Sequence, residues 1–147
     1  MVRIRVMTAE DYDGVYALWS HTPGLRLNPV DDSPRGIQAY LARNPSTSFV
    51  AEAQGRIVGA LLAGHDGRRG FLYHAAVHPQ FRRRGIGARL AEHAVTALER
   101  EGIQKAALVA FAQNEAGNRF WDRMGFSRRT DLVYRNRATH PADSPSP

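Results

Sequence analysis

The sequence contains no cysteine. This absence excludes disulfide bonds, thiolate zinc sites and a cysteine nucleophile, and it fits a reducing compartment. No apolar run approaches the roughly 20 residues of a membrane span. Residues 1–7 alternate arginine with aliphatic side chains, a pattern unlike that of a signal peptide. We therefore expect a cytoplasmic protein with no membrane partner, whose core depends on packing alone.

Lysine is almost absent as well, since the 147 residues include one lysine and 19 arginines, with a net charge of +6. Guanidinium groups bind phosphates in bidentate geometry. The arginines cluster at residues 82–84 and 128–129. Charge alone leaves open whether these clusters bind phosphate or form a solvated basic surface. Length and a hydrophobic content of 43% indicate one globular domain.

Hydrophobic periodicity predicts a mixed α/β (α+β) order of elements. Alternation with a period of two predicts strands over residues 2–6, 48–53, 56–63 and 70–77. The capping patterns at Thr8 and Ser33 predict two early helices, and a four-residue apolar repeat predicts a helix over residues 85–100.

The remaining pattern predicts three more elements and a tail. A short apolar run predicts a buried strand over residues 106–111, and Asn114 is placed to cap a helix that ends at Gly125. A final strand is expected over residues 126–137. Residues 138–147 contain prolines and serines with almost nothing apolar, so we expect a disordered tail behind a domain of residues 1–137.

The stretch LYHAAVHPQFRRRGIGARL, residues 72–90, is typical of an anion site. A predicted strand ends at a proline, and a loop of arginine and glycine leads directly into a helix. Gly85 and Gly87 lack a Cβ, so their backbone can turn tightly and approach a ligand, while the first N–H groups of the helix have no partner. A glycine-bearing turn with solvated arginines remains the alternative on spacing alone.

The same residues resemble the acetyl-CoA loop of the GCN5-related N-acetyltransferase (GNAT) family, which has the pattern Gln/Arg-x-x-Gly-x-Gly/Ala. Residues 82–87 match it after Val77 and Pro79. A second family motif, Asn-x-x-Ala/Gly-x-x-x-Tyr-x-x-x-Gly-Phe, is matched from Asn114 to Phe126, with Trp121 at the tyrosine position. The resemblance covers about residues 2–137, and residues 66–86 are most similar to small bacterial members of the YpeA type. It implies a mostly antiparallel mixed sheet, splayed at the acetyl-CoA site, with helices on both faces.

The resemblance also implies which residues contact acetyl-CoA. The pantetheine arm would lie along Ala75, Ala76 and Val77 as an added strand. The pyrophosphate would sit on the loop, and Asn114 and Trp121 would lie on the opposite side. The loop residues implied are Arg82, Arg83, Arg84, Gly85, Ile86, Gly87 and Ala88.

The family transfers acetyl directly from acetyl-CoA to an amine, with a backbone N–H near Val77 polarising the carbonyl oxygen. Two positions depart from the family pattern. Trp121 replaces the tyrosine that donates a proton to the leaving thiolate, and Val109 replaces a glutamate base. The candidates for proton transfer are therefore Tyr73, His74 and Tyr134.

Strand alternation predicts that Tyr73 shares a face with Ala75 and Val77, and that His74 shares the other with Ala76. Both Tyr73 and His74 could instead be structural. Between the first two helices, Asp31 and Asp32 could attract a cationic amine or form a solvated loop, and Trp19 could line the acceptor mouth or be core. No metal site is expected, because His74 and His78 would lie about 13 Å apart on a strand.

Three functions remain distinct at this point. The first is an acetyl-CoA-dependent N-acetyltransferase acting on an amine acceptor that the sequence does not identify. The second is a CoA or acetyl-CoA sensor without turnover, which Val109 and Trp121 favour. The third, an arginine-rich RNA-binding domain, is less well supported because the nearby aromatics are few and lie in apolar patterns. Many family members dimerise, so a homodimer is an open alternative.

Overall fold

The computed structural model describes residues 1–140 and groups them into two compact units, residues 1–108 and residues 109–140. The first unit holds a sheet with the strand order β1-β2-β3-β4-β5. Its strands are β1 (Arg3–Val6), β2 (Phe49–Ala53), β3 (Arg56–His65), β4 (Gly70–Val77) and β5 (Ala106–Ala107). All neighbours pair antiparallel except β4 and β5, which are parallel, so the expected mixed and mostly antiparallel sheet is confirmed.

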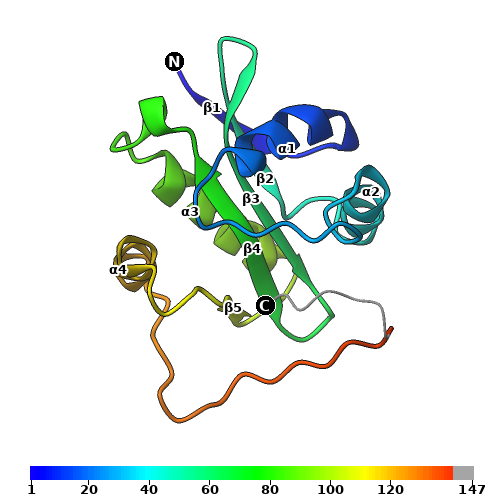
Figure 1. The fold of residues 1–147 in the computed structure, drawn as a ribbon, viewed down its shortest axis with the longest axis vertical. Helices are drawn as coiled ribbons and strands as arrows, with labels where there is room; N and C mark the ends of the chain where they lie inside the picture. The colour runs from blue at the N-terminus through cyan, green and yellow to red at the C-terminus, as the bar shows by residue number, and fades with distance from the viewer. Residues whose placement is uncertain (141–147) are drawn as a thin grey trace. The chain divides into compact units, whose positions relative to one another are not determined.

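Helices cover both faces of this sheet (Figure 1). On one face, α1 (Tyr12–Ser20) and α2 (Pro34–Arg43) pack their apolar side chains against the sheet, and Trp19 at 0% exposure lies in this core. On the other face lies α3 (Ile86–Arg100). A Cβ at Gly59 of β3 would come within 3.2 Å of Ile86 and 3.1 Å of Leu90, so this glycine lets α3 approach the sheet closely.

Local sequence signals account for where the helices begin. A short 3-10 turn, η1 (Ala9–Asp11), precedes α1 with the expected Thr8–Asp11 capping box. The Ser33 hydroxyl accepts a hydrogen bond from Gly36 N–H at the start of α2. A second 3-10 turn, η2 (Pro79–Phe81), links β4 to the arginine loop before α3.

The second unit contains α4 (Glu115–Arg123), which begins at the predicted cap Asn114. The strand predicted over residues 126–137 is wrong, because the structure has no strand in that segment. A strand needs a paired neighbour for its N–H and C=O groups, and here the apolar side chains of Leu132 and Val133 are 60% and 75% exposed.

The strand predicted over residues 106–111 is also shorter than expected. It forms a ladder only at Ala106 and Ala107. The expected tail of residues 138–147 lies mostly outside the described residues.

Candidate active site

The edge of β4 that faces β5 is open over most of its length. β4 pairs with β3 from Gly70 to Val77 but with β5 only at Gly70 and Phe71. Beyond Phe71, no strand of the described chain pairs with this edge. An extended ligand can hydrogen bond to such an edge in the manner of an added strand. The predicted pantetheine contacts, Ala75 to Val77, lie on this open stretch.

A bulge interrupts β4 in the middle of the open stretch. Tyr73 lies opposite Leu62, and Ala76 lies opposite Ala60, so two residues of β4 face a single residue of β3. One of the two is His74, whose φ of 53° is in the left-handed region. An extra residue in one strand bends it and changes the direction of its side chains.

The bulge breaks the predicted alternation at Tyr73, whereas the His74 ring contacts Trp19 of the core cluster that also contains Ala76, as expected. Tyr73 shares a face with Ala76, because their partners on β3 are two residues apart. The expectation that Tyr73 groups with Ala75 and Val77 is therefore wrong. Side chains alternate between the two faces of a sheet only while the pairing register is constant. The extra residue in β4 shifts this alternation by one position for the side chains that follow it.

The bulge residue is held by side chains from the α1–α2 region. The indole N–H of Trp19 donates to the His74 carbonyl at 3.1 Å, and the two rings meet edge to face with centroids 5.0 Å apart. The imidazole Nε2 of His74 lies 3.0 Å from Oδ1 of Asp32. The second carboxylate oxygen of Asp32 accepts the N–H of Asn28 at 2.7 Å, and Tyr12 donates its hydroxyl to the Asp32 carbonyl.

The sequence indicated Asp32 as an attractor of the amine or as part of a solvated loop, and it did not predict the contact with His74. The Asp32 side chain is buried, with 5% of the residue exposed. The prediction of a solvated loop is therefore confirmed only for Asp31, which is exposed. No local pattern links Asp32 to His74, since 42 positions separate them. The sequence allowed Trp19 either to line the acceptor mouth or to lie in the core. In the structure Trp19 is a core residue, and its indole N–H donates a hydrogen bond to β4.

The loop before α3 has the backbone of an anion site. Arg83 has a φ of 63° and Gly85 a φ of 75°, so two left-handed residues flank Arg84. The first bond of the helical ladder runs from Arg89 N–H to the Gly85 carbonyl at 3.0 Å. The N–H groups of residues 86–88 precede that bond and have no helical acceptor, and Gly85 supplies no side-chain cap. The start of α3 therefore presents donors to an anion.

Two arginines of the loop have contacts within the loop region. The Nε of Arg82 donates to the Val77 carbonyl at 3.2 Å, which ties the loop to the end of β4. The guanidinium of Arg84 lies 4.9 Å from the centroid of the Phe81 ring, within the range of a cation–π contact. The Arg82 side chain therefore donates a hydrogen bond to a carbonyl at the open edge of β4. The Arg83 side chain forms no hydrogen bond within the described residues.

Strained backbone occurs at the β4 bulge and in the loop before α3. Within the described residues, positive φ occurs at three non-glycine positions, which are Gln54, His74 and Arg83. Gln54 belongs to the tight turn between β2 and β3. His74 and Arg83 instead flank the open end of β4. Residues forced into this region persist only where the surrounding structure requires it, and they cluster at functional sites.

The second family motif builds the N-terminus of α4. The Asn114 side-chain oxygen accepts the N–H of Gly117 at 3.0 Å. A Cβ at position 117 would lie 2.4 Å from the Asn114 amide nitrogen, so the Asn114 side chain would have to shift to admit one. Trp121 packs edge-on against Phe120 and Phe126, with centroids 4.8 Å and 5.2 Å apart. Within its unit, Trp121 is thus an aromatic packing residue.

Most of the chain matches a known protein family. Residues 12–126 match the model of the acetyltransferase (GNAT) family. The chain belongs to this family. A curated acetyltransferase of Yersinia enterocolitica is 31% identical over 132 residues, covering 90% of this chain and 92% of that protein. This membership makes the chain an acyl-CoA-dependent acetyltransferase, with acetyl-CoA as the co-substrate.

Solved structures share the fold. The PaiA N-acetyltransferase from Thermoplasma acidophilum, solved with coenzyme A, has a TM-score of 0.77 at 18% identity, covering 97% of this chain and 95% of that one. The ribosomal-protein-S18-alanine N-acetyltransferase from Escherichia coli has a TM-score of 0.73 at 20% identity, covering 88% and 80%. The expected fold class is therefore confirmed.

The candidates for proton transfer in this acetyltransferase lie in different places. Tyr73 is 42% exposed, and its ring contacts Phe71 and Tyr40 at centroid distances of 4.7 Å and 6.1 Å. Burial raises the pKa of Tyr40, whose hydroxyl has no hydrogen-bond partner in the described chain. Tyr134, at 55% exposure, and Val109, at 40%, belong to the second unit. Of the candidates, His74 is bonded to a buried carboxylate, that of Asp32.

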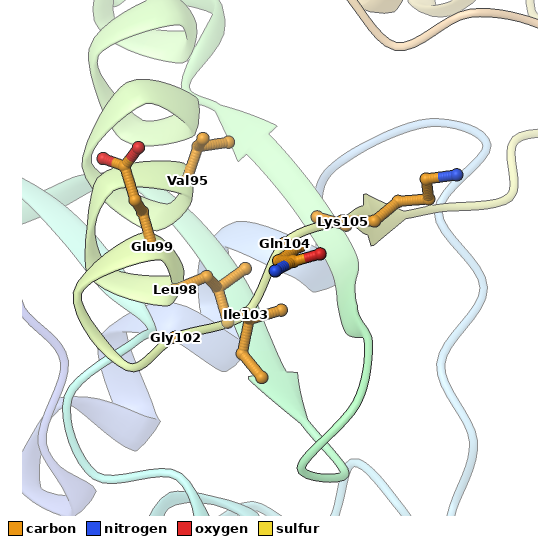
Figure 2. A pocket seen from close by; sticks show the side chains of 8 residues that line it. Val95, Leu98, Glu99, Gly102, Ile103, Gln104 and Lys105 are labelled. Carbon is orange, nitrogen blue, oxygen red and sulfur yellow. The ribbon is translucent and has the colours of Figure 1, made fainter.

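A separate hollow of about 470 Å³ lies beside the C-terminal end of α3 (Figure 2). None of the predicted site residues lines it, and its lining contains no histidine, serine, threonine or tyrosine. It is therefore not the candidate active site. The lining residues are Val95, Leu98, Glu99, Gly102, Ile103, Gln104, Lys105 and Ala106.

Residues 1–140 contain neither a candidate metal centre nor a candidate membrane span. That range contains no cluster of three or more histidine, aspartate or glutamate side chains able to hold a metal ion. It also contains no helix with the length and apolar character needed to cross a membrane.

Proposed function

We propose that this acetyltransferase transfers the acetyl group of acetyl-CoA directly to a primary amine. The open, bulged edge of β4 beside the uncapped start of α3 carries the proposal. An extended pantetheine arm fits backbone groups at Ala75, Ala76 and Val77. The pyrophosphate fits the donors of residues 83–88, with Arg82 alongside.

The transfer requires one bond to form and one to break. The lone pair of an uncharged amine attacks the thioester carbonyl carbon, and a C–N bond replaces the C–S bond. The sulfur leaves with the bonding electron pair as the CoA thiolate. The amine nitrogen loses its surplus proton to a base, for which Tyr73 and His74 are the candidates. The thiolate takes up a proton from solvent.

Calorimetric titration with acetyl-CoA, CoA and ATP at two salt concentrations tests the binding site. We expect acetyl-CoA and CoA to bind more tightly than ATP at both salt concentrations, because only they carry the pantetheine arm. Equal and strongly salt-dependent binding of all three would instead indicate a general phosphate surface of the RNA-binding kind.

An amine screen then tests turnover. The acceptors are an alanine-initiated peptide, an N-terminally blocked lysine peptide, kanamycin and spermidine, with release of CoA as the readout. We expect at least one amine to release CoA faster than water does. Tight acetyl-CoA binding without turnover of any amine would support the second candidate, a CoA sensor, which Val109 and Trp121 favour because neither side chain can act as the usual base or acid.

A further inference from the structure

His74 differs from the other histidines of the first unit in the use of its ring nitrogens. In those four, Nδ1 hydrogen bonds to a backbone group no more than four residues away. They are His21, His65, His78 and His93. In His74 the bonded nitrogen is Nε2, and its partner is the buried carboxylate of Asp32, from a distant segment. The His74 ring is therefore oriented by tertiary structure.

The bond to Asp32 fixes which nitrogen carries the hydrogen. An ionised carboxylate only accepts hydrogen bonds, so the Nε2 atom of His74 must donate. In the neutral ring the lone pair then lies on Nδ1. This atom forms no hydrogen bond within the described residues and is not among the buried unpartnered atoms, and the side chain is 20% exposed. A basic lone pair is thus left accessible on the residue directly before the proposed pantetheine contacts, which begin at Ala75.

We propose that Nδ1 of His74 accepts the proton that the acceptor amine loses, and that Asp32 is the positioning residue that holds His74 in the required tautomer. This inference rests on the proposed acetyl transfer. The N–H bond of the amine breaks and an Nδ1–H bond forms, while the imidazole becomes a cation that the Asp32 carboxylate stabilises. The arrangement needs no residue at the positions of Val109 or Trp121.

Two tyrosines contact the pair. Tyr73 lies next to His74, with ring centroids 6.4 Å apart, and Tyr12 donates its hydroxyl to the backbone carbonyl of Asp32. Within the described residues, neither lysine nor arginine forms an ion pair with Asp32. The negative charge of Asp32 is therefore directed at His74 and at the N–H of Asn28.

The replacement Asp32→Asn gives a sharp test because both carboxylate oxygens are in use. The Asn28 N–H is a donor and needs an oxygen, so the amide of the variant must keep its oxygen on that side. Its NH₂ group then faces the Nε2 atom of His74 and donates to it. This change moves the ring hydrogen to Nδ1, and the accessible lone pair disappears.

The tautomer is measured by nitrogen-15 NMR of the imidazole ring in the full chain at a pH where the ring is neutral. We expect the hydrogen of the neutral His74 ring on Nε2 in the wild-type protein and on Nδ1 in Asp32→Asn. Kinetics use whichever amine of the screening panel gives the highest turnover. We expect kcat to fall on the order of 100-fold in Asp32→Asn and His74→Gln, with the KM for acetyl-CoA unchanged. His74→Gln should also lose the acidic limb of the pH profile.

Two variants serve as matched controls. Asp31→Asn makes the same charge change one residue away, on an exposed side chain. His65→Gln breaks another histidine–carboxylate pair, in which Nε2 lies 2.6 Å from Glu101. Both should keep wild-type kcat, and thermal unfolding of all variants separates loss of fold from loss of chemistry.

The possible results separate failure of the proposed base from failure of the proposed acetyl transfer. Full turnover in Asp32→Asn or His74→Gln would overturn the proposal while leaving the proposed acetyl transfer intact. An unchanged tautomer in Asp32→Asn would overturn the role of Asp32. A wild-type chain that binds acetyl-CoA but acetylates none of the amines would overturn both the transfer and the base together.

Discussion

Single residues with unusual backbone mark the site. Gly85 adopts a φ of 75° and has no atom within 4 Å of an ideal Cβ, so the position restricts backbone conformation but not side-chain volume. A β-branched residue is strongly disfavoured at positive φ. The loop can therefore be distorted without a steric clash in the core.

At this scale we predict that Gly85→Val weakens acetyl-CoA binding by 10-fold or more, because the chain must leave the left-handed region to relieve about 1–2 kcal/mol of strain. Calorimetry measures the affinity. Gly67→Val is the matched control, since Gly67 has a φ of 93° and open space but lies in the turn between β3 and β4. If both variants bind acetyl-CoA like the wild-type chain, the loop does not hold the pyrophosphate.

A second residue-scale prediction concerns the anchor of the bulge. Trp19→Phe removes the donor to the His74 carbonyl, and a typical hydrogen bond contributes about 0.5–1.5 kcal/mol to stability. We expect the free energy of unfolding to fall by about that amount in urea titrations. Trp121→Phe is the control, because the Trp121 indole N–H donates no hydrogen bond within the described residues. An equally large decrease in the free energy of unfolding in Trp121→Phe would contradict the role of the Trp19 N–H as an anchor of the bulge.

The elements of the chain differ in how their first turns are satisfied. The N-terminus of α2 is capped by Ser33 and that of α4 by Asn114, both at 3.0 Å. The N-terminus of α3 has Gly85 and no side-chain cap. A capped helix has fewer N–H groups left for a ligand. The helix that starts beside the open edge of β4 thus has no side-chain cap, which is also true of α1.

We predict that Ser33→Ala lowers the free energy of unfolding by about 1 kcal/mol without changing acetyl-CoA affinity. The affected donors belong to α2, which lies outside the proposed CoA contacts. Chemical denaturation and calorimetry measure the two quantities. Ser127→Ala, at an exposed serine that caps no helix, should leave both unchanged, and weaker acetyl-CoA binding in Ser33→Ala would show that α2 takes part in the CoA site.

At the scale of the whole molecule, ionised carboxylates join distant segments. Arg5 on β1 forms ion pairs with Asp11 at 2.7 Å and with Glu52 on β2 at 3.1 Å. Burial acts to raise the pKa of Asp11, but hydrogen bonds from Arg5 and from the Thr8 N–H outweigh it, and the pKa lies below the ordinary value. Hydrogen bonds from Ser46 and then His65 lower the pKa of Glu101.

These shifts predict acid sensitivity. A carboxyl whose pKa is lower in the folded chain binds fewer protons there than in the unfolded chain, so its contribution is present above the unfolded value and is lost as pH falls. For Asp11 this loss begins near its ordinary value of 3.8 and continues below it. We expect the free energy of unfolding to decrease between pH 5 and pH 3, and Asp11→Asn to flatten that slope. Asp13→Asn is the control, and an unchanged slope in Asp11→Asn would contradict the role of the Arg5 pair.

The sequence by itself determined the elements and the loop. Capping residues at positions 8, 33 and 114 act on N–H groups two or three residues away, and the period of apolar side chains reports burial along one helix or strand. Short-range rules of this kind correctly placed β4, α3 and the start of α4. The two family motifs indicated the family for the same reason, since each is a contiguous pattern.

Only the tertiary structure decided the bulge at His74 and the contact with Asp32. A bulge depends on the register with β3, and the Asp32 carboxylate reaches His74 across 42 residues, so no spacing in the sequence encodes either. The predicted strand over residues 126–137 failed for a related reason. Its local pattern favours an extended chain, but a strand forms only where a neighbouring strand accepts and donates its hydrogen bonds.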